Sequence, residues 1–399
     1  MRNPLSKRIV EIEPSGIRKF FDIVNEMEDA ISLGVGEPDF DTPWHIRDEG
    51  IFSLEKGRTF YTSNAGLKEL KQEIAKYIYR KCNITYDYKK EIMVTVGGSE
   101  AIDIAMRAML DPGDEVLIPQ PSYVSYEPCA ILANGTPVII ELKEENEFRL
   151  TKEELEAAIT PKTKLLVLPF PNNPTGALYP KEVLQQIVDV AREHQIMIFS
   201  DEIYDRLVMD DEEHVSIASL APDLFCVTFS GLSKSHMIAG FRVGWMVLSG
   251  NKAMAKDYIL GLNMLSNMRL CSNVPAQSIV QTALGGHQSV QNYIVPGGRI
   301  YEQREYIYKA LNDIPGITAV KPKAAFYIFP KVDTKKFNIV DDEKFALDLL
   351  RDKKILIIHG GGFNWHQPDH FRVVYLPRTE ILKDATGKLA DFLSSYKQK

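Results

Sequence analysis

A lysine whose surroundings suit nucleophilic chemistry follows a predicted apolar strand. Lys234 lies in the segment Ser230-Gly-Leu-Ser-Lys-Ser235, and Arg242 follows it within Gly240-Phe-Arg-Val-Gly244. Most lysine side chains lie in solvent. A lysine held at the end of a buried strand beside a second cation has its pKa lowered from ~10.4 toward neutrality, because burial and the neighbouring charge both disfavour protonation. These residues predict an amine able to form a Schiff base with a carbonyl compound.

A carboxylate and a phenol follow another apolar run. Asp201 comes after the predicted strand Ile196–Phe199 and one serine, and Tyr204 lies three residues later. An isolated carboxylate in an apolar setting needs a cationic or hydrogen-bond-donating partner. Asp201 considered alone is explained more simply as the N-cap of a short helix that runs through Tyr204, so the residues leave a ligand-binding and a capping interpretation open.

Two further segments lie where predicted strands end. In Pro169-Phe-Pro-Asn-Asn-Pro-Thr-Gly176, Asn173 can donate and accept hydrogen bonds at the carboxyl end of a strand, where open α/β sheets bind ligands. Val96-Gly-Gly-Ser-Glu-Ala101 contains Gly98 and Ser99 at a predicted helix start, whose free N–H groups attract anions. Either segment could also be a plain turn. The glycine spacing is not GxGxxG, so a dinucleotide fingerprint is not supported.

These residues need a scaffold that brings the strand ends together. Short apolar runs without polar alternation, as in parallel strands buried on both faces, alternate with helical patterns. The predicted strands are residues 92–96, 115–119, 137–142, 165–169, 196–199, 225–229 and 240–248. Thr151-Lys-Glu-Glu154 is a capping-box pattern, and Pro180 stands where another helix begins. The alternation predicts an α/β fold whose sheet is mostly parallel and covered by helices on both faces.

The pattern changes near residue 285. Gly285-Gly286 ends the alternation, a long helix is predicted from about Gln291 to Asn312, and short strands follow at residues 326–329, 355–358 and 371–375. The first 40 residues are too irregular to form a domain of their own. We therefore expect a large domain over residues 46–287 and a smaller α+β domain made of residues 288–399 with an N-terminal arm, residues 1–45.

Composition argues against several classes of protein. The chain has 399 residues, of which 45% are hydrophobic and 25% charged, as in ordinary globular proteins. A formal net charge of −7 without basic blocks argues against nucleic-acid binding. Four scattered cysteines predict neither a disulfide framework nor a metal site. No apolar run approaches the ~20 residues of a membrane span, and the first residues lack the apolar core of a secretory signal, so we expect a cytoplasmic protein with no membrane contact.

The segments around these candidate residues occur in the order found in the fold-type I (class I/II) pyridoxal-phosphate (PLP) aminotransferases, which the sequence resembles. The resemblance runs from Ser32-Leu-Gly-Val-Gly-Glu-Pro-Asp-Phe40 to Phe371-Arg-Val-Val374. Residues 261–277 and Gly361-Gly-Phe-Asn-Trp365 are similar to the bacterial alanine aminotransferase branch, whereas the N-terminal half is closer to aspartate and aromatic enzymes. The resemblance implies the fold of that family, PLP as cofactor, an amino acid and a 2-oxo acid as substrates, and no metal.

The resemblance also implies roles for individual residues. Lys234 corresponds to the lysine that forms the internal aldimine with the cofactor. Asp201 corresponds to the carboxylate that keeps the ring nitrogen protonated, so that the ring acts as an electron sink. Tyr204 and Asn173 correspond to donors to the 3-oxygen of the ring, and Tyr123 to the aromatic side chain on the ring face. The residues that correspond to the phosphate site are Gly98, Ser99, Ser233 and Arg242.

Three residues correspond to groups that reach beyond the cofactor of the same chain. Tyr61 corresponds to the tyrosine that binds the phosphate of the partner subunit, which implies a homodimer. Arg372 corresponds to the arginine that binds the substrate α-carboxylate as a bidentate pair, with assistance from the Gly36 backbone and Asn173. An amino group would thus move between alanine, the expected amino donor, and 2-oxoglutarate.

Several alternatives stay open at this stage. An aspartate or aromatic amino-acid aminotransferase and a PLP-dependent carbon–sulfur β-lyase share the cofactor residues. Arg269 could bind a second substrate carboxylate or form a structural ion pair. An α/β-hydrolase, suggested by His359-Gly-Gly-Gly362, is disfavoured because this segment follows Ser99 instead of preceding it. A regulator built on the PLP fold is disfavoured because no helix-turn-helix segment precedes residue 30.

Where the family often carries Ser or Thr, three residues before the lysine, this chain has Gly231, and Ser230 could replace the missing hydroxyl.

Overall fold

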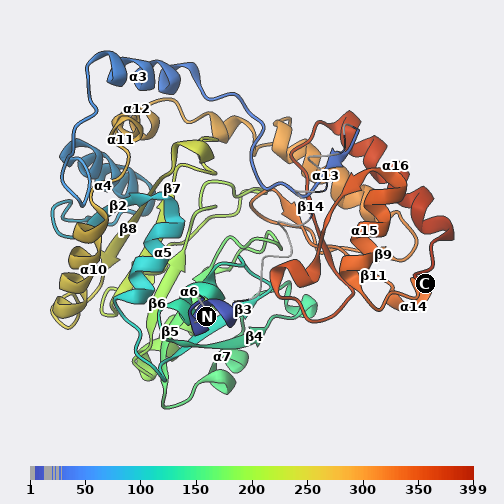
Figure 1. Ribbon diagram of the computed structural model, residues 1–399, viewed down its shortest axis with the longest axis horizontal. Helices are drawn as coiled ribbons and strands as arrows, with labels where there is room; N and C mark the ends of the chain where they lie inside the picture. Colours follow the sequence, from blue (N-terminus) through green and yellow to red (C-terminus); the bar gives the residue numbers. More distant parts are fainter. Residues whose placement is uncertain (1–4, 13–19, 21–22, 24–26, 28) are drawn as a thin grey trace.

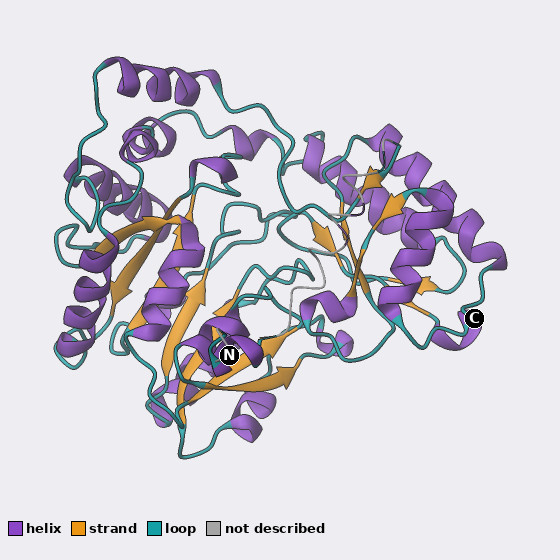
Figure 2. Cartoon of the chain, viewed as in Figure 1, coloured by secondary structure: helices purple, strands orange, loops and turns teal. Residues whose placement is uncertain are grey.

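The computed structural model describes residues 5–12, 20, 23, 27 and 29–399. A seven-stranded sheet forms its centre, drawn in Figure 2 as the larger group of orange arrows. In spatial order the strands are β2 (Ile92–Val96), β8 (Val243–Ser249), β7 (Cys226–Gly231), β6 (Met197–Asp201), β5 (Thr163–Pro169), β3 (Glu115–Gln120) and β4 (Thr136–Glu141). Strand β8 runs antiparallel to both neighbours and the other pairs are parallel, so the sheet is mixed and mostly parallel, as the sequence predicts.

Helices cover both faces of this sheet because its central strands present apolar side chains on both sides (Figure 1). On one face, α5 (Gly97–Arg107), α6 (Tyr126–Leu132) and α10 (Lys256–Arg269) pack over a core that contains Val167 and Phe199. On the other face, α4 (Lys68–Cys82), α8 (Lys181–Glu193) and α12 (Val280–Gly285) pack over strand side chains such as Ile198 and Trp245. Further helices of this part are α1 (Lys7–Val10), α3 (Trp44–Glu55), α7 (Lys152–Ala158), α9 (Ile217–Leu220) and α11 (Val274–Ser278). The predicted capping box at the start of α7 is present.

The C-terminal elements, orange to red in Figure 1, form a smaller α+β unit. Its helices are α13 (Arg299–Asn312), α14 (Thr334–Phe337), α15 (Asp342–Lys353) and α16 (Thr379–Ser395). Its strands are β9 (Ile317–Thr318), β10 (Tyr327–Ile328), β11 (Lys331–Val332), β12 (Ile355–Leu356), β13 (Ile358–His359) and β14 (Phe371–Val374). Strands pair in the orders β10-β14-β13 and β11-β9, and β12 pairs with β1 (Ile31–Ser32). Residues 31–32 therefore pair with this unit, whereas α1 packs on α6, where Arg8 Nη1 donates to Ile131 O over 2.7 Å.

Two predicted boundaries are wrong. The helix predicted from about Gln291 begins only at Arg299, because Val295-Pro-Gly-Gly298 forms a turn in which Gly297 has φ +83°. The strand predicted to start at Gly240 starts at Val243, because a 3₁₀ turn covers residues 239–241 and Arg242 has φ +53°. Left-handed backbone cannot continue a helix or a strand, and such conformations leave a weak signal in the sequence unless glycine supplies them.

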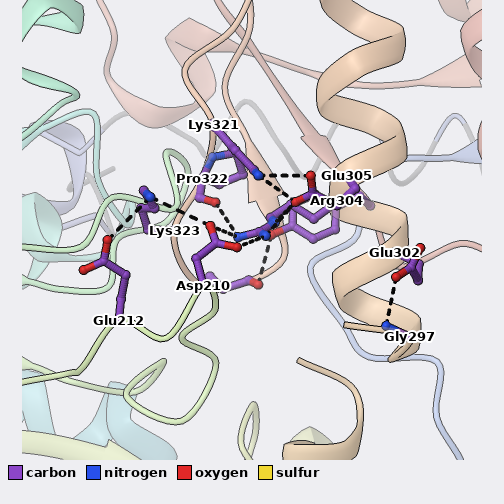
Figure 3. Close-up of polar contacts among 11 residues, drawn as sticks. Asp210, Glu212, Gly297, Glu302, Arg304, Glu305, Lys321, Pro322 and Lys323 are labelled. Atoms are coloured by element: carbon purple, nitrogen blue, oxygen red, sulfur yellow. Dashed lines mark hydrogen bonds and ion pairs between the residues drawn. The ribbon is translucent and has the colours of Figure 1, made fainter. Parts of the chain in front are cut away.

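A cluster of ion pairs joins the C-terminal unit to the loop that follows β6 (Figure 3). The side chain of Arg304 on α13 is fully buried, and its Nη1 donates to Asp210 Oδ2 over 2.9 Å. Its Nη2 donates to the other carboxylate oxygen of Asp210 and to Glu305. Lys323 lies at the edge of the cluster, 3.8 Å from Asp210. Because a buried guanidinium needs its carboxylate partner, this pair fixes the loop against α13.

Backbone hydrogen bonds continue the same connection. Met209 N donates to Lys323 O over 3.0 Å, and Ala325 N donates to Leu207 O over 2.8 Å. The segment after Tyr204 is thereby tied to the segment that leads into β10. Among the described helices, none has both the length and the apolar composition needed to cross a membrane.

Candidate active site

The candidate residues that sequence analysis takes from separate segments surround one cavity of about 480 Å³. It opens where β5, β6 and β7 end, and the C-terminal unit supplies its other wall. The candidates that line it are Gly36, Gly98, Ser99, Tyr123, Asn173, Asp201, Tyr204, Ser230, Ser233, Lys234, Arg242 and Arg372. Tyr61 is the exception: its side chain is 83% exposed and lies outside the cavity.

Lys234 lies in the middle of the cavity wall, three residues beyond β7. Its Nζ donates to Gly36 O over 2.7 Å. Burial lowers the pKa of Lys234 to about 8, and the positive charges of Arg372 and Arg242 act in the same direction, while Glu37 opposes them. A substantial fraction of this amine is therefore neutral near physiological pH, as attack on a carbonyl carbon requires.

Asp201 is the last residue of β6 and is buried. Its Oδ2 accepts a hydrogen bond from the Tyr126 hydroxyl over 2.7 Å, and its Oδ1 accepts one from Ile203 N over 3.2 Å. The helix N-cap interpretation is wrong, because residues 203–206 form a turn and no helix follows. Burial raises the pKa of Asp201 to about 6, an effect that these two donors offset only in part and that Glu202 increases. A cationic group in the cavity would stabilise the carboxylate further.

A cradle for an anion lies where α5 begins. Gly97 has φ +72°, and a Cβ there would lie 2.3 Å from Arg242 Nη2, so glycine is required for the approach of the guanidinium. Gly98 and Ser99 follow in the first turn of α5, whose free N–H groups favour negative charge. Ser233 and Arg242 also line the cavity. Backbone amides, a hydroxyl and a guanidinium are the usual ligands of a phosphate group.

The glycine that departs from the family pattern has a steric explanation. A Cβ on Gly231 would lie 2.7 Å from Val243 O, because β7 and β8 approach closely at this point. Serine or threonine cannot be accommodated there without moving β8. Ser230, the preceding residue, lines the cavity and is the nearby source of a hydroxyl.

A carboxylate-binding group lies at the opposite end of the cavity. Arg372 is buried on β14, and its Nη1 donates to Asn173 Oδ1 over 2.8 Å, while its Nη2 donates to Gly34 O. Its guanidinium lies between the rings of Tyr327 and Phe363, at 4.7 and 4.6 Å from their centroids. Among the described residues, the buried Nε has no hydrogen-bond partner. Burial lowers the pKa of Arg372 from its usual value, so an anionic ligand would relieve both an unpaired donor and a buried charge.

Two tyrosines connect the centre of the cavity to this arginine. The hydroxyls of Tyr204 and Tyr327 lie 2.8 Å apart, and both side chains are buried. Tyr123, from the loop after β3, lines the cavity with its ring edge-on to Tyr126 at 5.5 Å. The partner roles of Tyr126, Tyr327 and Phe363 were not predicted from the sequence. Tyr126 begins α6 only three residues after the candidate Tyr123, and this closeness in sequence was the available signal for the first of them.

Arg269 forms a structural ion pair in this chain. Its Nη2 donates to Asp103 Oδ2 over 2.7 Å, and its Nε lies 3.8 Å from Glu100 Oε1. It does not line the cavity. Of the two interpretations that the sequence left open, the ion pair is the one found within a single chain.

Comparisons with known proteins point to one family. The sequence model of the family described as "Aminotransferase class I and II" matches residues 28–385. The glutamate-pyruvate aminotransferase AlaA of Haemophilus influenzae is 45% identical over 401 residues, covering 100% of this chain and 96% of that protein. The crystal structure of an aminotransferase from Escherichia coli is similar with a TM-score of 0.95 and 43% identity, covering 100% of both chains. An alanine aminotransferase from Pyrococcus furiosus has a TM-score of 0.93 and 35% identity, covering 98% of this chain and 99% of that one.

The cofactor of this family fits the cavity by its chemistry. PLP carries a phosphate, a pyridine nitrogen and an aldehyde. The cavity offers an anion cradle at the start of α5, the carboxylate of Asp201 without a cationic partner, and the partly neutral amine of Lys234. The unpaired Nε of Arg372 suits the carboxylate of an amino acid. The chain belongs to the class I and II aminotransferases, a family of PLP-dependent enzymes.

Proposed function

We propose that this aminotransferase moves the amino group of L-alanine to 2-oxoglutarate, giving pyruvate and glutamate. The observation that carries the proposal is that the partly neutral amine of Lys234, the buried carboxylate of Asp201 and the unpaired Nε of Arg372 line one cavity. The choice of alanine is supported by the names of two relatives, a glutamate-pyruvate aminotransferase and an alanine aminotransferase.

The residues that would hold PLP follow from their chemistry. The phosphate would be bound by Gly98, Ser99, Ser233 and Arg242, with Ser230 as a further hydroxyl donor. Asp201 would accept the ring N–H, and its second oxygen stays oriented by Tyr126. When bound, PLP supplies the electron sink that stabilises negative charge at the substrate α-carbon.

The ring 3-oxygen would accept hydrogen bonds from Tyr204 and Asn173. Asn173 Oδ1 accepts from Arg372, so its Nδ2 keeps both protons for other acceptors. Tyr123, which lines the cavity, would pack on the face of the ring. These contacts would orient the PLP ring between the anion cradle at the start of α5 and the carboxylate-binding group of Arg372.

Lys234 would have two roles. Its amine would be the point of covalent attachment for the cofactor aldehyde, and after release it would take the proton from the substrate α-carbon and deliver it again during transfer. A pKa near 8 suits both roles, because the amine is neutral in part and protonated in part at neutral pH.

Substrate binding would use residues from the N-terminal segment, the central sheet and the C-terminal unit. Arg372 would bind the α-carboxylate, assisted by the Gly36 backbone and by Asn173. Within the part of the chain that the structure describes, the cationic residues lining the cavity are Lys234, Arg242 and Arg372, and each has a role above. The small side chain of alanine needs no further cation, which favours it over a dicarboxylate as the first substrate. The distal carboxylate of glutamate would need a donor from elsewhere in the assembly.

We further propose that the enzyme is a homodimer in which Tyr61 reaches the phosphate of the partner subunit. The side chain of Tyr61 is 83% exposed, and Phe60, Met264, Met268 and Leu270 beside it are exposed as well. The hydrogen bond from Asn64 to Asn267 holds this loop against the end of α10. Several exposed large apolar side chains on neighbouring segments are typical of a protein–protein interface.

Subunit mixing tests the dimer. Chains carrying Lys234→Ala and chains carrying Tyr61→Ala should each have little activity alone. Mixed dimers would contain one intact site, so activity should exceed the sum of the separate samples. No gain on mixing, or a fully active monomer in sedimentation at assay concentration, would contradict the proposal.

The division into two domains also stays a proposal. We propose that residues 46–287 form one rigid body and residues 288–399 with 1–45 the other, and that substrate bridges them through Asn173 and Arg372. Structures with and without a substrate analogue should then differ in the angle between the two bodies.

The substrate assignment is tested by kcat/KM for alanine, aspartate, phenylalanine and cystathionine with 2-oxoglutarate as acceptor. Alanine should give the highest value. A value for alanine about tenfold or more below that of aspartate or phenylalanine would refute the substrate choice and leave the transaminase class intact. Release of ammonia and pyruvate from cystathionine without an acceptor would favour the β-lyase.

A further inference from the structure

Tyr327 lies between the two functional ends of the cavity. Its hydroxyl is 2.8 Å from the hydroxyl of Tyr204, and its ring packs on the guanidinium of Arg372 at 4.7 Å. It is 1% exposed, although its hydroxyl belongs to the same cavity lining as Lys234. A buried hydroxyl costs free energy unless it is hydrogen-bonded, so the direction of its one proton matters.

Either hydroxyl can be the donor in the 2.8 Å contact, so its direction depends on which other acceptors compete for the two protons. Burial raises the pKa of both Tyr204 and Tyr327, so each phenol is neutral at physiological pH and has one proton to donate. Gly36 O is the other acceptor near Tyr327, but it lies 3.5 Å away and already accepts from Lys234 Nζ at 2.7 Å. The shorter contact of Tyr327 is therefore with Tyr204. When Tyr327 donates to Tyr204, the Tyr204 proton is left for an acceptor in the cavity.

No charged group around the two tyrosines competes, among the described residues, for the proton that Tyr327 would donate to Tyr204. Arg372 on β14 and Asp201 at the end of β6 are the ionic side chains that influence Tyr204. Arg372 also faces Tyr327, together with the neutral ring of Tyr123. The guanidinium is held by Asn173 and Gly34, so it keeps the ring of Tyr327 in place from one side. The ion pair of Arg304 with Asp210 (Figure 3) and the backbone hydrogen bonds of Met209 and Ala325 tie the segment after Tyr204 to the segment before Tyr327.

We propose that Tyr327 is a positioning residue whose hydroxyl donates to Tyr204 and directs the Tyr204 proton to the 3-oxygen of PLP. This inference rests on the proposed role of Tyr204 toward the cofactor and adds a residue that acts through it. The two hydroxyls form a short chain of donors, Tyr327 to Tyr204 to the ring oxygen. A phenol that itself accepts a hydrogen bond is a better donor, so removal of Tyr327's hydroxyl weakens the second bond as well.

The bound cofactor reports the effect through its absorbance. Hydrogen bonds to the ring oxygen stabilise the deprotonated form of the bound chromophore, so losing part of them raises the pH midpoint of its spectral titration. For Tyr327→Phe in the holoenzyme we expect a midpoint raised by about 0.5 to 1 pH unit, the size of one neutral hydrogen bond. The phenyl ring still packs on Arg372, so KM for alanine should stay within about twofold while kcat falls about three- to tenfold.

Two comparisons separate positioning from a general loss of packing. Tyr375→Phe removes another buried hydroxyl, which donates to Ala325 O over 3.1 Å, and should leave the midpoint within about 0.2 pH unit of the wild-type value. Tyr204→Phe should raise the midpoint more than Tyr327→Phe does. In the double variant Tyr204→Phe/Tyr327→Phe the midpoint should equal that of Tyr204→Phe alone, because Tyr327 acts through Tyr204.

The outcomes distinguish this inference from the proposed function. An unchanged midpoint in Tyr327→Phe overturns the inference. So does a midpoint that Tyr327→Phe raises by the same amount in wild-type protein and in the Tyr204→Phe variant. A wild-type protein that binds no PLP refutes the proposed function instead. Should Tyr327→Phe fail to fold, Gly36→Ala provides a second variant, because its Cβ would lie 2.5 Å from the Tyr327 hydroxyl and displace it. A raised midpoint is expected there too, and an unchanged one overturns the inference.

Discussion

Arg372→Lys is the substitution that probes the carboxylate end of the cavity most selectively. Lysine keeps the charge but replaces a planar fork by a point charge, so it can make one charge-assisted hydrogen bond where the guanidinium makes two. It also loses the stacking between Tyr327 and Phe363 that fixes the orientation of the fork. One charge-assisted hydrogen bond contributes about 1.5–3 kcal/mol, which predicts that kcat/KM for alanine falls about 10- to 150-fold.

The assay follows the half-reaction of the holoenzyme with alanine by the change in absorbance of the bound cofactor. Ethylamine, which lacks the carboxylate, serves as the reference amine and should react at the same rate in both proteins. Arg299→Lys is a matched control, because Arg299 binds Asp39 by ionic hydrogen bonds but does not line the cavity. A loss of less than about threefold for alanine, or an equal loss for ethylamine, would refute the assignment of Arg372.

Three further predictions concern charge and stability. The rate at which apoprotein attaches PLP should rise with pH and level off above about 8, because Lys234 must be neutral to react; a rise that continues to 10.5 would contradict its lowered pKa. In apoprotein, Asp201→Asn should raise the Tm at pH 8 and have less effect on it at pH 4. The folded-state pKa of Asp201, about 6, lies above the usual 3.8, so the buried carboxylate becomes charged and destabilises the fold as pH rises through this window. An equal effect on the Tm at both pH values would contradict this reasoning. Arg304→Ala should lower the free energy of unfolding by about 3–5 kcal/mol, because it leaves Asp210 without its partner. The more exposed Arg192→Ala, measured by the same denaturant titration, should cost about 1 kcal/mol or less, and similar losses in both would disprove the role of the buried pair.

Local sequence signals indicated the residues at the strand ends as candidates, and the resemblance to a family supplied their expected roles. Asn173, Asp201 and Lys234 each follow an apolar strand, and parallel neighbours bring their carboxyl ends together. The pairing of β5, β6 and β7 therefore gathers residues that are far apart in the chain. The fold class was predictable for this reason, and so was the gathering of these three residues around one cavity.

Other contacts depend on packing that no local pattern contains. Arg372 lies on a short strand of the C-terminal unit, and only the resemblance to a family connected it with the cavity. The hydroxyl of Tyr126 reaches Asp201 because α6 packs over the sheet, whereas its apolar neighbours make it resemble a core residue. The bond of Tyr327 to Tyr204 depends on the loop that the ion pair of Arg304 with Asp210 holds against α13. Such contacts follow from tertiary structure and have no signature in spacing.

The identity of the attached lysine tests the central claim most directly. Holoenzyme is reduced with borohydride, digested with a protease, and the peptide that carries the pyridoxyl group is sequenced by mass spectrometry. We predict that the group lies on Lys234, and that Lys234→Ala retains the fold by circular dichroism while losing both the label and transaminase activity. A label on another lysine, no label at all, or substantial transaminase activity in Lys234→Ala would contradict the account.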